Sequence, residues 1–417
     1  MSRSSENEKP PAYHSKLFVP LASSRPETTP DFSHIDIPSP SDSQKPDVMS
    51  DAADIQSLAY GLVRVLGDDN LCSGPWVPQL DSKQLLEGLK QMVEVRAYDN
   101  RMFKMQRQGK LSFYIKSTGE EAIAIAQAMA LKPTDMLFPS YRQQGLLFAR
   151  KYSIKDMMCQ CLSNAKDHIK GRQMPIFYSS PAHNYFSISG NLATQYSQAV
   201  GWAMACAYKG EDHIAASWVG DGTTAAADVY HALVFGSTYK APVILNVVNN
   251  QWAISTPQSF ASTGTTFAAR SIGLNIPGIK VDGNDFLAVY AVTQWAAERA
   301  RKGAGPTFIE LYTYRTEGHS TSDNPDAYRG KNEADFWPLG DPIDRLKDHL
   351  IAIGLWSQKQ QDDLQAQSTE LMTQHWKASL RHGCLDDGPH WPVASMFEDV
   401  FEDIPAHLAK QSQQIGG

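Results

Sequence analysis

Two short polar motifs, spaced as the two strand ends of one strand–helix–strand unit, could together bind a metal ion. Gly-Asp-Gly at 220–222 follows a short apolar run, and Asn-Asn at 249–250 follows a second, β-branched one. The carboxylate of Asp221 and the amide oxygen of Asn250 are hard ligands, which favour magnesium or calcium over zinc. The flanking glycines allow a tight turn and a close approach to a ligand. We therefore treat Asp221 and Asn250 as candidate metal ligands.

The acidic residue in the first motif indicates what the metal would hold. A carboxylate about 4 Å from a phosphate charge is repelled by about 4 kcal/mol at an effective dielectric of 20, and a cation between them reverses the sign. A helix expected to start near Thr223 would direct free N–H groups and a positive dipole end toward the same place. Asp221 therefore favours a metal-bridged diphosphate over a bare one.

Two other interpretations of this turn stay open on the residues alone. GDGTTA at 220–225 fits the loose dinucleotide pattern G-x-G-x-x-[GA]. That pattern expects an acidic residue at the end of the second strand, where Asn249 and Asn250 stand. The other alternative is a tight turn and a polar loop without a ligand, because one glycine-rich turn is a weak signal.

The elements around the motifs predict an α/β fold with a doubly wound parallel sheet. Strands are expected at 214–219, 242–248, 278–281 and 307–314, alternating with helices, and such alternation is typical of parallel sheets with right-handed crossovers. Ligands of these sheets bind at the carboxyl ends of strands, where both motifs lie. The periodicity further predicts helices at 82–109, 118–131 (opened by a Thr118–Glu121 capping box), 194–209, 223–236 and, capped by Asn284, up to 301.

The chain divides into three expected regions. Residues 1–80 form an extended N-terminal arm, in which the first fifty residues hold eight of the 24 prolines and cannot sustain regular structure. The apolar residues 17–19 and Phe32 suggest that this arm lies on a surface. Residues 81–340 form the α/β domain that would carry the diphosphate module, and 341–417 form a helical C-terminal region with a docking tail.

Bulk properties exclude several classes of protein. A formal net charge of −7 argues against nucleic acid as a main partner. No apolar run reaches the roughly 18 residues that a membrane span needs, and the N-terminus lacks the apolar core of a signal peptide. The five cysteines are odd in number and scattered, which favours reduced thiols and a cytoplasmic location.

Seven segments carry a resemblance to a known family. They are TGEEA at 118–122, SYRQQG at 140–145, KGRQMP at 170–175, SISGNLATQ at 187–195, NNQWAIST at 249–256, VDGNDFLAVY at 281–290 and YRTEGHSTSDNPDAYR at 314–329. Together with the spacing of GDG and NN, they resemble the α subunit of branched-chain 2-oxo acid dehydrogenase. This is the decarboxylating first component of its complex, and the N- and C-terminal segments resemble the bacterial form.

This resemblance implies the thiamine-diphosphate-binding fold, with thiamine diphosphate and magnesium as cofactors. Asp221 and Asn250 would ligate magnesium through their side chains, and Trp252 through its carbonyl. The other residues that the resemblance places against the cofactor are Tyr141, Arg142, Gly190, Leu192, Gly222 and His319. Arg142 suits a bidentate phosphate contact, and its alternative is a surface salt bridge. Phe113 and Leu192 would line the pocket for the aliphatic chain of the substrate, although either could equally be a core residue.

His319 is the candidate catalytic residue, because the resemblance places it beside the diphosphate and the reactive carbon, and imidazole can move protons near neutral pH. The loop that follows would order itself and dock a lipoyl-bearing partner through Arg315, Asp323, Tyr328 and Arg329. A potassium ion is held in some relatives by the stretch that matches Ser189, Asn191, Thr194 and Gln195. Gly190 and Asn191 replace the Ser–Pro of animal forms here, which leaves potassium open.

One position departs from the family pattern. Animal relatives have an arginine just before Asn-Asn that contacts the diphosphate, and Val248 stands there in this chain. Another group of this chain, or the partner subunit, would have to meet that phosphate charge.

The resemblance also implies partners and an activity. No segment matches the glutamate-bearing module that activates the pyrimidine ring, and in this family the β subunit supplies it. We therefore expect an α2β2 heterotetramer, active only with the β subunit. Its reaction would be the oxidative decarboxylation of branched 2-oxo acids with reductive acylation of a lipoyl group on the acyltransferase. The alternatives are a pyruvate or acetoin dehydrogenase α subunit, an NAD-type dehydrogenase, and a non-catalytic subunit with a relict site.

Overall fold

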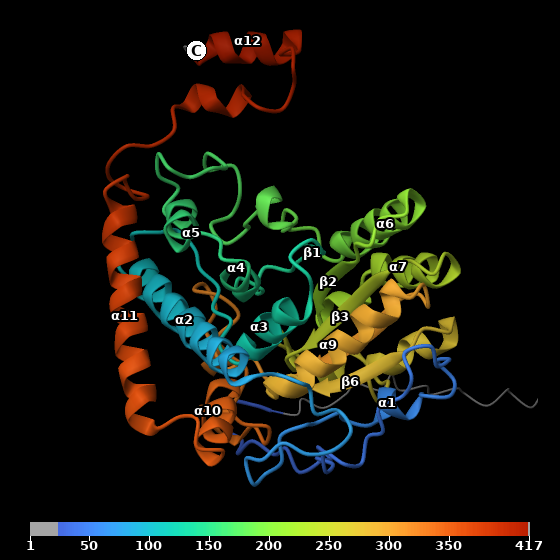
Figure 1. Cartoon of the computed structure of the whole chain (residues 1–417). Coiled ribbons are helices and arrows are strands. Elements are labelled where there is room, and N and C mark those ends of the chain that lie inside the picture. Colours follow the sequence, from blue (N-terminus) through green and yellow to red (C-terminus); the bar gives the residue numbers. More distant parts are fainter. Residues whose placement is uncertain (1–23, 416–417) are drawn as a thin grey trace, which may run out of the picture.

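The computed structural model describes residues 24–415 of the chain. Residues 17–19, which we expected to lie on a surface, are outside this range. The described part begins with an extended segment and ends in a short helix, and the sheet that carries the two polar motifs lies between them (Figure 1).

Five parallel strands form the central sheet in the order β1-β2-β3-β7-β6. The strands are β1 (Met136–Phe138), β2 (Ala215–Gly220), β3 (Val243–Asn249), β6 (Gly278–Asp282) and β7 (Thr307–Tyr312). The expected doubly wound α/β sheet is confirmed, including all four strands that the sequence predicted. The fifth strand, β1, was missed because three residues are too few to give a period. A separate antiparallel pair, β4 (Trp252–Ala253) and β5 (Thr256–Pro257), follows the second motif.

Helices cover both faces of the sheet and separate its apolar residues into two cores. On one face lie α3 (Glu121–Ala130) and α9 (Phe286–Arg301), and on the other lie α6 (Thr194–Lys209), α7 (Ala227–Thr238) and the 3-10 helix η3 (Ala268–Leu274). Along β3, Ile244 and Val248 pack in the first core, and Val243, Leu245 and Val247 in the second. This alternation is the two-residue period of a strand buried on both faces.

A further helical layer lies beyond α3. It consists of α2 (Ser82–Arg107), α10 (Pro342–Ala352) and α11 (Gln358–Leu380), and Figure 1 shows α11 running alongside α2. The remaining helices are α1 (Ser57–Tyr60), α4 (Gly145–Ala149), α5 (Ile154–Cys161), α8 (Gln258–Ala261), α12 (Ala406–Gln414) and the 3-10 helices η1 (Pro181–His183), η2 (Gly222–Ala225), η4 (Pro325–Ala327), η5 (Glu333–Phe336) and η6 (Val393–Phe397).

The predicted capping box at 118–121 is wrong. Glu120 is the N-cap of α3 and makes no capping bond with its side chain. The Thr118 hydroxyl is buried without a partner among the described residues. The Glu121 carboxylate accepts from the Gly119 N–H at 2.9 Å, not from that of Thr118, and forms an ion pair with Arg96 of α2. Asn284 does not cap α9 either, because the Asp285 carboxylate accepts from the N–H groups of Leu287 and Ala288.

The helix expected from Thr223 begins later. Residues 222–225 form the 3-10 turn η2, Ala226 is extended, and α7 starts at Ala227. The N–H groups and dipole end of a long helix therefore do not follow directly on Asp221. The cause is local, since neither Asp221 nor Ala226 makes a side-chain cap.

The two flanking regions differ in how closely they pack on the sheet domain. Phe32 of the N-terminal segment lies edge-on against Tyr314 and Trp337, at 5.8 and 5.3 Å between ring centroids. The C-terminal tail, residues 391–415, stands apart from the body with η6 and α12 (Figure 1). The tail is tied back by Lys170, whose Nζ lies 2.5 Å from Glu398 and 2.6 Å from Asp399.

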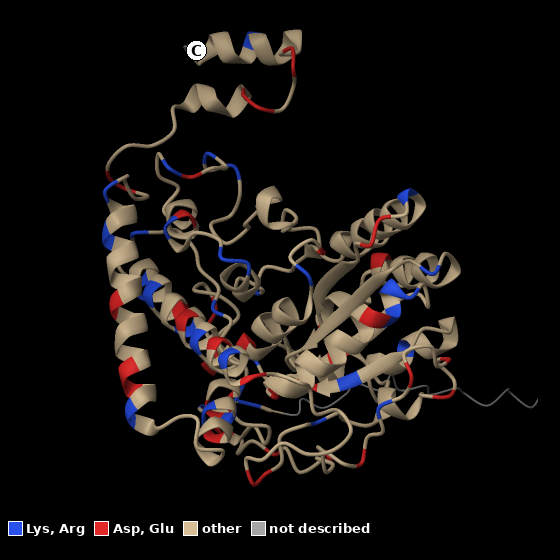
Figure 2. Cartoon of the chain, in the orientation of Figure 1, with Lys and Arg blue, Asp and Glu red and all other residues tan. Residues whose placement is uncertain are grey.

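Charges of both signs are interspersed along α2 and α11 (Figure 2). Among the described residues, no helix is long and apolar enough to cross a membrane. The boundaries at residues 80 and 340 stay a prediction.

Candidate active site

The two polar motifs meet at the carboxyl edge of the sheet. Gly220, the last residue of β2, pairs with Val248 of β3, and the Asp221 N–H donates to the Val248 carbonyl at 3.1 Å. Asp221 therefore lies one step beyond this pair, and Asn250 two steps beyond it on the neighbouring strand. Adjacent strands are about 4.8 Å apart, so the two motifs are neighbours at this edge of the sheet.

The Asp221 carboxylate is buried and only partly satisfied. The residue is 2% exposed, and within residues 24–415 its Oδ2 atom has no hydrogen-bond partner. Burial raises the pKa of this carboxyl group to about 6, and the Gly222 N–H opposes that shift. An unpartnered buried carboxylate oxygen is costly unless a cation or a donor meets it.

Gly222 is required by a close approach of two chain segments. A Cβ atom at this position would lie 2.4 Å from the Cβ atom of Ala253, which is far below van der Waals contact. The absence of a side chain lets the turn after β2 lie against β4 and leaves its N–H groups accessible.

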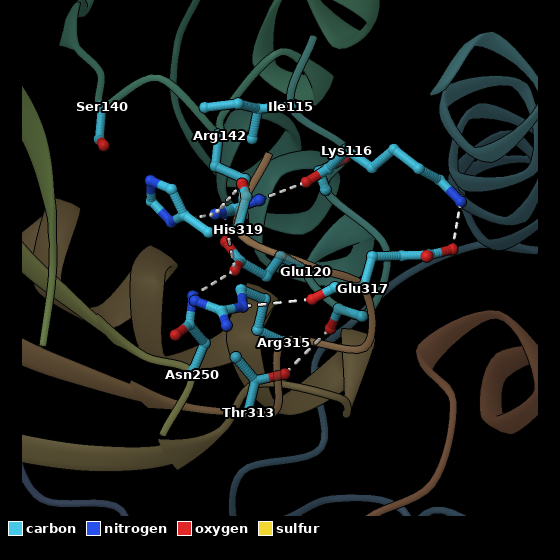
Figure 3. A network of polar contacts seen from close by, with 12 residues as sticks. Ile115, Lys116, Glu120, Ser140, Arg142, Asn250, Thr313, Arg315, Glu317 and His319 are labelled. Carbon is cyan, nitrogen blue, oxygen red and sulfur yellow. Dashed lines mark hydrogen bonds and ion pairs between the residues drawn. The ribbon is translucent and has the colours of Figure 1, made fainter. Parts of the chain in front are cut away.

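Glu120 joins the second motif to the arginine of the SYRQQG segment (Figure 3). Its Oε1 atom accepts from Asn250 Nδ2 at 2.7 Å and lies 3.5 Å from Arg142 Nε. Burial raises the pKa of Glu120 to about 7, while Arg142 and then Asn250 oppose the shift. This role of Glu120 was not predicted, because the TGEEA segment also fits a helix cap. Two adjacent acids before an alanine-rich apolar helix were the available signal.

Arg142 also contacts the candidate catalytic histidine. Its Nη2 atom lies 3.4 Å from His319 Nδ1 and donates to the His319 carbonyl at 3.2 Å, and its Nη1 atom donates to the Lys116 carbonyl at 2.5 Å. The Tyr141 ring stands edge-on to the imidazole at 5.8 Å. The structure thus brings together Tyr141, Arg142 and His319. Arg142 does form an ion pair, with Glu120, but this pair is buried and is not the surface salt bridge of the alternative interpretation.

The His319 imidazole is held neutral. Burial, then Arg142 and Arg315, lower its pKa to about 3, and Asp323 opposes them weakly. A guanidinium donates and cannot accept, so the Nδ1 atom that faces Arg142 is the acceptor and the ring proton sits on Nε2. This tautomer leaves an Nε2–H group free to donate.

The loop after His319 is ordered by the four residues that the sequence singled out. Arg315 Nη2 donates to the Tyr328 hydroxyl at 2.6 Å, and this hydroxyl donates to Asp323 Oδ2 at 2.6 Å. The same Asp323 oxygen accepts from the His319 N–H at 2.6 Å. Arg329 donates to the Arg315 carbonyl at 2.7 Å. The loop thereby fixes the backbone that carries His319.

Arg315 links this loop to the second motif. Its Nη1 atom donates to the Trp252 carbonyl at 3.1 Å, and the Trp252 N–H donates to Asn250 Oδ1 at 3.3 Å. Burial and then Arg142 lower the pKa of the Arg315 guanidinium to about 10. The carbonyl that the sequence named as a metal ligand therefore has a hydrogen-bond donor on it.

Within residues 24–415, no side-chain hydrogen bond or ion pair joins the remaining predicted residues to this network. Phe113 is half-buried against the larger core, and Leu192 is 51% exposed. Gly190 and Asn191 are exposed in the same segment before α6. Val248 is buried in the α3/α9 core, so its side chain does not reach the site.

The potassium candidates surround the start of α6. The Ser189 hydroxyl accepts from the Asn191 N–H at 3.1 Å, and the Thr194 hydroxyl donates to the Asn191 carbonyl at 3.0 Å. Gln195 donates to the Trp218 carbonyl, and its Oε1 atom is buried without a partner.

Comparison with known proteins shows which family the chain matches. Residues 89–383 match the family described as dehydrogenase E1 component, and residues 14–53 match the N-terminal region of 2-oxoisovalerate dehydrogenase E1 α subunits. The first match covers Asp221, Asn250, Arg142 and His319.

Curated relatives match over most of the chain. The 2-oxoisovalerate dehydrogenase subunit α of Pseudomonas aeruginosa is 52% identical over 96% of this chain and 98% of its own length. The mitochondrial α subunit of Bos taurus is 37% identical over 81% of this chain and 73% of its own, and subunit α 2 of Arabidopsis thaliana is 38% identical over 84% and 73%. The resemblance stated from the motifs is confirmed: the chain belongs to the dehydrogenase E1 component family, among its 2-oxoisovalerate dehydrogenase α subunits.

Proposed function

We propose that this chain is the α subunit of a thiamine-diphosphate-dependent enzyme that oxidatively decarboxylates branched 2-oxo acids and passes the acyl group to a lipoyl partner. The observation that carries the proposal is Asp221, a buried carboxylate with an unpartnered oxygen at the carboxyl edge of a parallel sheet. Family membership supports the same conclusion, because dehydrogenase E1 components use thiamine diphosphate.

The residues at this edge fit magnesium and a diphosphate. Asp221 and Asn250 would hold the ion through oxygen atoms, with the Trp252 carbonyl as a third ligand. Gly222 would present its N–H to the diphosphate, and Arg142 and Tyr141 would face it from the other side. An unpartnered buried oxygen also supports a monovalent cation such as potassium near Gln195, because the Oε1 atom of Gln195 is buried and has no partner among the described residues.

Thiamine diphosphate supplies, when bound, the electron sink that a 2-oxo acid needs in order to lose carbon dioxide. The share of this chain is positioning and charge neutralisation. Arg142 meets phosphate charge, and the loop ordered by Arg315 and Asp323 holds His319. The free Nε2–H of His319 would donate to an oxygen of the reacting group. Phe113 and Leu192 would contact the aliphatic chain, and the His319 loop would dock the lipoyl domain.

The surface of the chain supports a partner subunit. Five apolar side chains of the tail are about half exposed or more: Val393, Met396, Val400, Phe401 and Ile404. A groove of about 550 Å³ between α6 and α7 is also apolar, lined by Val200, Met204 and Phe235 among others. Exposed apolar patches of this kind mark protein interfaces, and we propose that the β subunit covers them in an α2β2 assembly. A cytoplasmic location is consistent with the free state of the five cysteines.

The isolated α chain is expected to lack activity, and the αβ complex to turn over 3-methyl-2-oxobutanoate in preference to pyruvate. The α chain alone should be inactive because none of its residues is assigned to activate the pyrimidine ring. The measurement is carbon dioxide release from both substrates, with and without the β subunit, after the bound cofactor has been identified. Full activity of the α chain alone, a preference for pyruvate, or bound NAD would each contradict the proposal.

Placing charge on the tail should weaken assembly. Val400→Asp and Phe401→Asp together bury two carboxylates in the proposed interface, where unpaired charge is costly. We expect at least about tenfold less β subunit to co-purify, since about 1.4 kcal/mol suffices for that loss. Leu71→Asp is the matched control, because Leu71 is similarly exposed but lies far along the chain from the tail. Equal recovery from the tail variant would place the interface elsewhere.

Glu120→Ala is expected to weaken magnesium binding about 10- to 100-fold, as removal of outer-sphere partners generally does. Glu120 fixes which end of the Asn250 amide faces the metal, through its bond to Nδ2. Glu120→Gln keeps an acceptor at this position and should retain most of the affinity. Titration of cofactor binding with magnesium measures both variants. An unchanged magnesium affinity in the alanine variant would show that Asn250 is oriented without Glu120.

A further inference from the structure

Three potential metal ligands gather at the C-terminal end of α6, outside the proposed active site. They are Cys206, Glu211 and His213, and one ligand atom of each lies within 4.8 Å of the others. All three come from one eight-residue segment that leads from the helix into β2. No residue of this cluster has a role in the proposed reaction.

Backbone hydrogen bonds hold the segment in this shape. Gly210 ends α6 in the left-handed conformation with φ 74°, and the Glu211 N–H donates back to the Cys206 carbonyl at 3.0 Å. This reversal folds Glu211 over the last turn of the helix. On the other side of His213, the Ile214 N–H donates to Asp135 Oδ1 at 3.2 Å. The backbone of this segment therefore brings the three ligands together.

The histidine is also oriented by its neighbours. The Trp202 ring is nearly parallel to the imidazole, at an interplanar angle of 14° and 6.4 Å between centroids. His213 Nδ1 lies 3.8 Å from the Glu211 carboxylate. Cys206 is 4% exposed, whereas the side chains of Glu211 and His213 are 41% and 39% exposed. One side of the cluster is therefore closed by the helix, and the other is open to an incoming ion.

We propose that Cys206, Glu211 and His213 bind a divalent transition metal ion, with zinc as the best match. Thiolate, imidazole and carboxylate are the ligand types that zinc takes in proteins, and a water molecule would complete a tetrahedron. Magnesium is disfavoured, because it prefers oxygen ligands alone. Tetrahedral zinc needs ligand atoms about 3.5 Å apart. Side-chain rotations that move the ligand atoms by about 1 Å would therefore bring them to the distances that zinc requires. The Cys206 thiol gives up its proton to solvent on binding.

The position of the cluster indicates a structural role. It lies where α6 ends and β2 begins, whereas Asp221 follows the opposite end of β2. The 16 residues of α6 span about 24 Å, which separates the cluster from the segment before Thr194. A bound ion would fasten the end of α6 to the start of β2. It should therefore raise thermal stability without changing turnover.

The test uses the αβ complex, freed of metals by a chelator and then loaded with magnesium and thiamine diphosphate. Addition of Co²⁺, the spectroscopic substitute for zinc, should produce a thiolate-to-cobalt charge-transfer band at one ion per α chain. Competition by Zn²⁺ should remove the band, and Zn²⁺ should raise the melting temperature.

Matched variants assign the ligands. Cys206→Ser and His213→Ala should each lower the Zn²⁺ affinity at least about tenfold and abolish the rise in melting temperature. Glu211→Gln should weaken binding less, because its amide oxygen can still coordinate. Cys72→Ser is the control, since Cys72 is an exposed free thiol, and it should behave like the parent complex.

Two results would overturn the proposal. One is a cobalt band or zinc stabilisation that persists in Cys206→Ser, and the other is the absence of both signals in the parent complex. The test of the zinc site does not depend on the proposed reaction, because its readouts are the absorbance of bound cobalt and the melting temperature. Loss of decarboxylation in the parent complex would bear on the proposed function alone.

Discussion

Replacing Asp221 by alanine is expected to raise the Kd of the αβ complex for thiamine diphosphate with magnesium by about 100-fold or more. Removing one partner of a buried charge pair typically costs about 3–5 kcal/mol, and each 1.4 kcal/mol is about tenfold in affinity. Asp221 is 2% exposed, and its Oδ2 atom has no hydrogen-bond partner among the described residues. No other described group therefore occupies the oxygen that the ion would use. Calorimetric titration with the cofactor at fixed magnesium measures the loss.

A matched control separates this effect from general damage. Asp228→Ala removes a carboxylate from the first turn of α7, seven residues further along the chain, and should leave the Kd unchanged. Full-affinity binding by Asp221→Ala would refute the metal site. It would also revive the alternative of a relict, non-catalytic subunit.

The cofactor-free chain offers a second readout of the same carboxylate. Its pKa is about 6 in the folded chain against an ordinary 3.8, so the folded state binds a proton more tightly than the unfolded state. Stability contributed by this proton is present below about pH 4 and is lost as the pH rises through about 6. Asp221→Asn should remove that loss and stabilise the cofactor-free chain near neutral pH. A melting temperature that is lower than that of the parent at pH 7 would contradict this expectation.

The elements that position the site were predictable from their hydrophobic patterns. β2 and β3 are largely apolar segments, interrupted by Ser217 and Asn246, that lead into GDG and NN. The helix α6 was predicted with the same bounds as observed, Thr194–Lys209. The start of α7 was not, because residues 223–226 offer no side-chain cap and the chain makes a 3-10 turn first. A hydrophobic pattern fixes the face of an element more firmly than its first residue.

The contacts between segments could not be predicted from spacing alone. Glu120 and Asn250 are 130 residues apart in the sequence and meet where the start of α3 approaches the carboxyl end of β3. The pattern of Glu120 and Glu121 fitted a helix cap equally well, and burial decided otherwise. The residue types around Asp221 predicted a metal–diphosphate turn, and the family resemblance named the cofactor. Neither predicted that Arg142 pairs with Glu120 and His319 at once.

We propose that other residues of this chain compensate for the departure from the family pattern at Val248. Val248 is enclosed by the α3/α9 core and offers no positive charge. Arg142 and Arg315 both reach the carboxyl edge of the sheet, and each lowers the pKa of His319 by its charge. Two guanidinium groups held this close repel each other, which a diphosphate would relieve. The charge that the missing arginine would supply is therefore partly present in other residues of this chain.

His319→Ala is expected to lower kcat of the αβ complex by about 100- to 10,000-fold, the usual effect of removing a positioned proton donor or acceptor. Cofactor affinity should change little, because Arg142 also donates to the His319 backbone carbonyl, which the variant keeps. Turnover of 3-methyl-2-oxobutanoate and the Kd for thiamine diphosphate measure the two effects. His168→Ala is the control, since His168 is 71% exposed.

Replacing His319 by asparagine or by glutamine tests which imidazole nitrogen is needed for turnover. Asparagine can place an acceptor where Nδ1 faces Arg142, and glutamine can place an N–H donor near the position of Nε2. Because Arg142 occupies the Nδ1 side, the proton available to substrate is on Nε2. His319→Gln should therefore retain more kcat than His319→Asn. The reverse order would mean that the bond to Arg142 matters more than the Nε2 proton, and His319 would then be a positioning residue for Arg142.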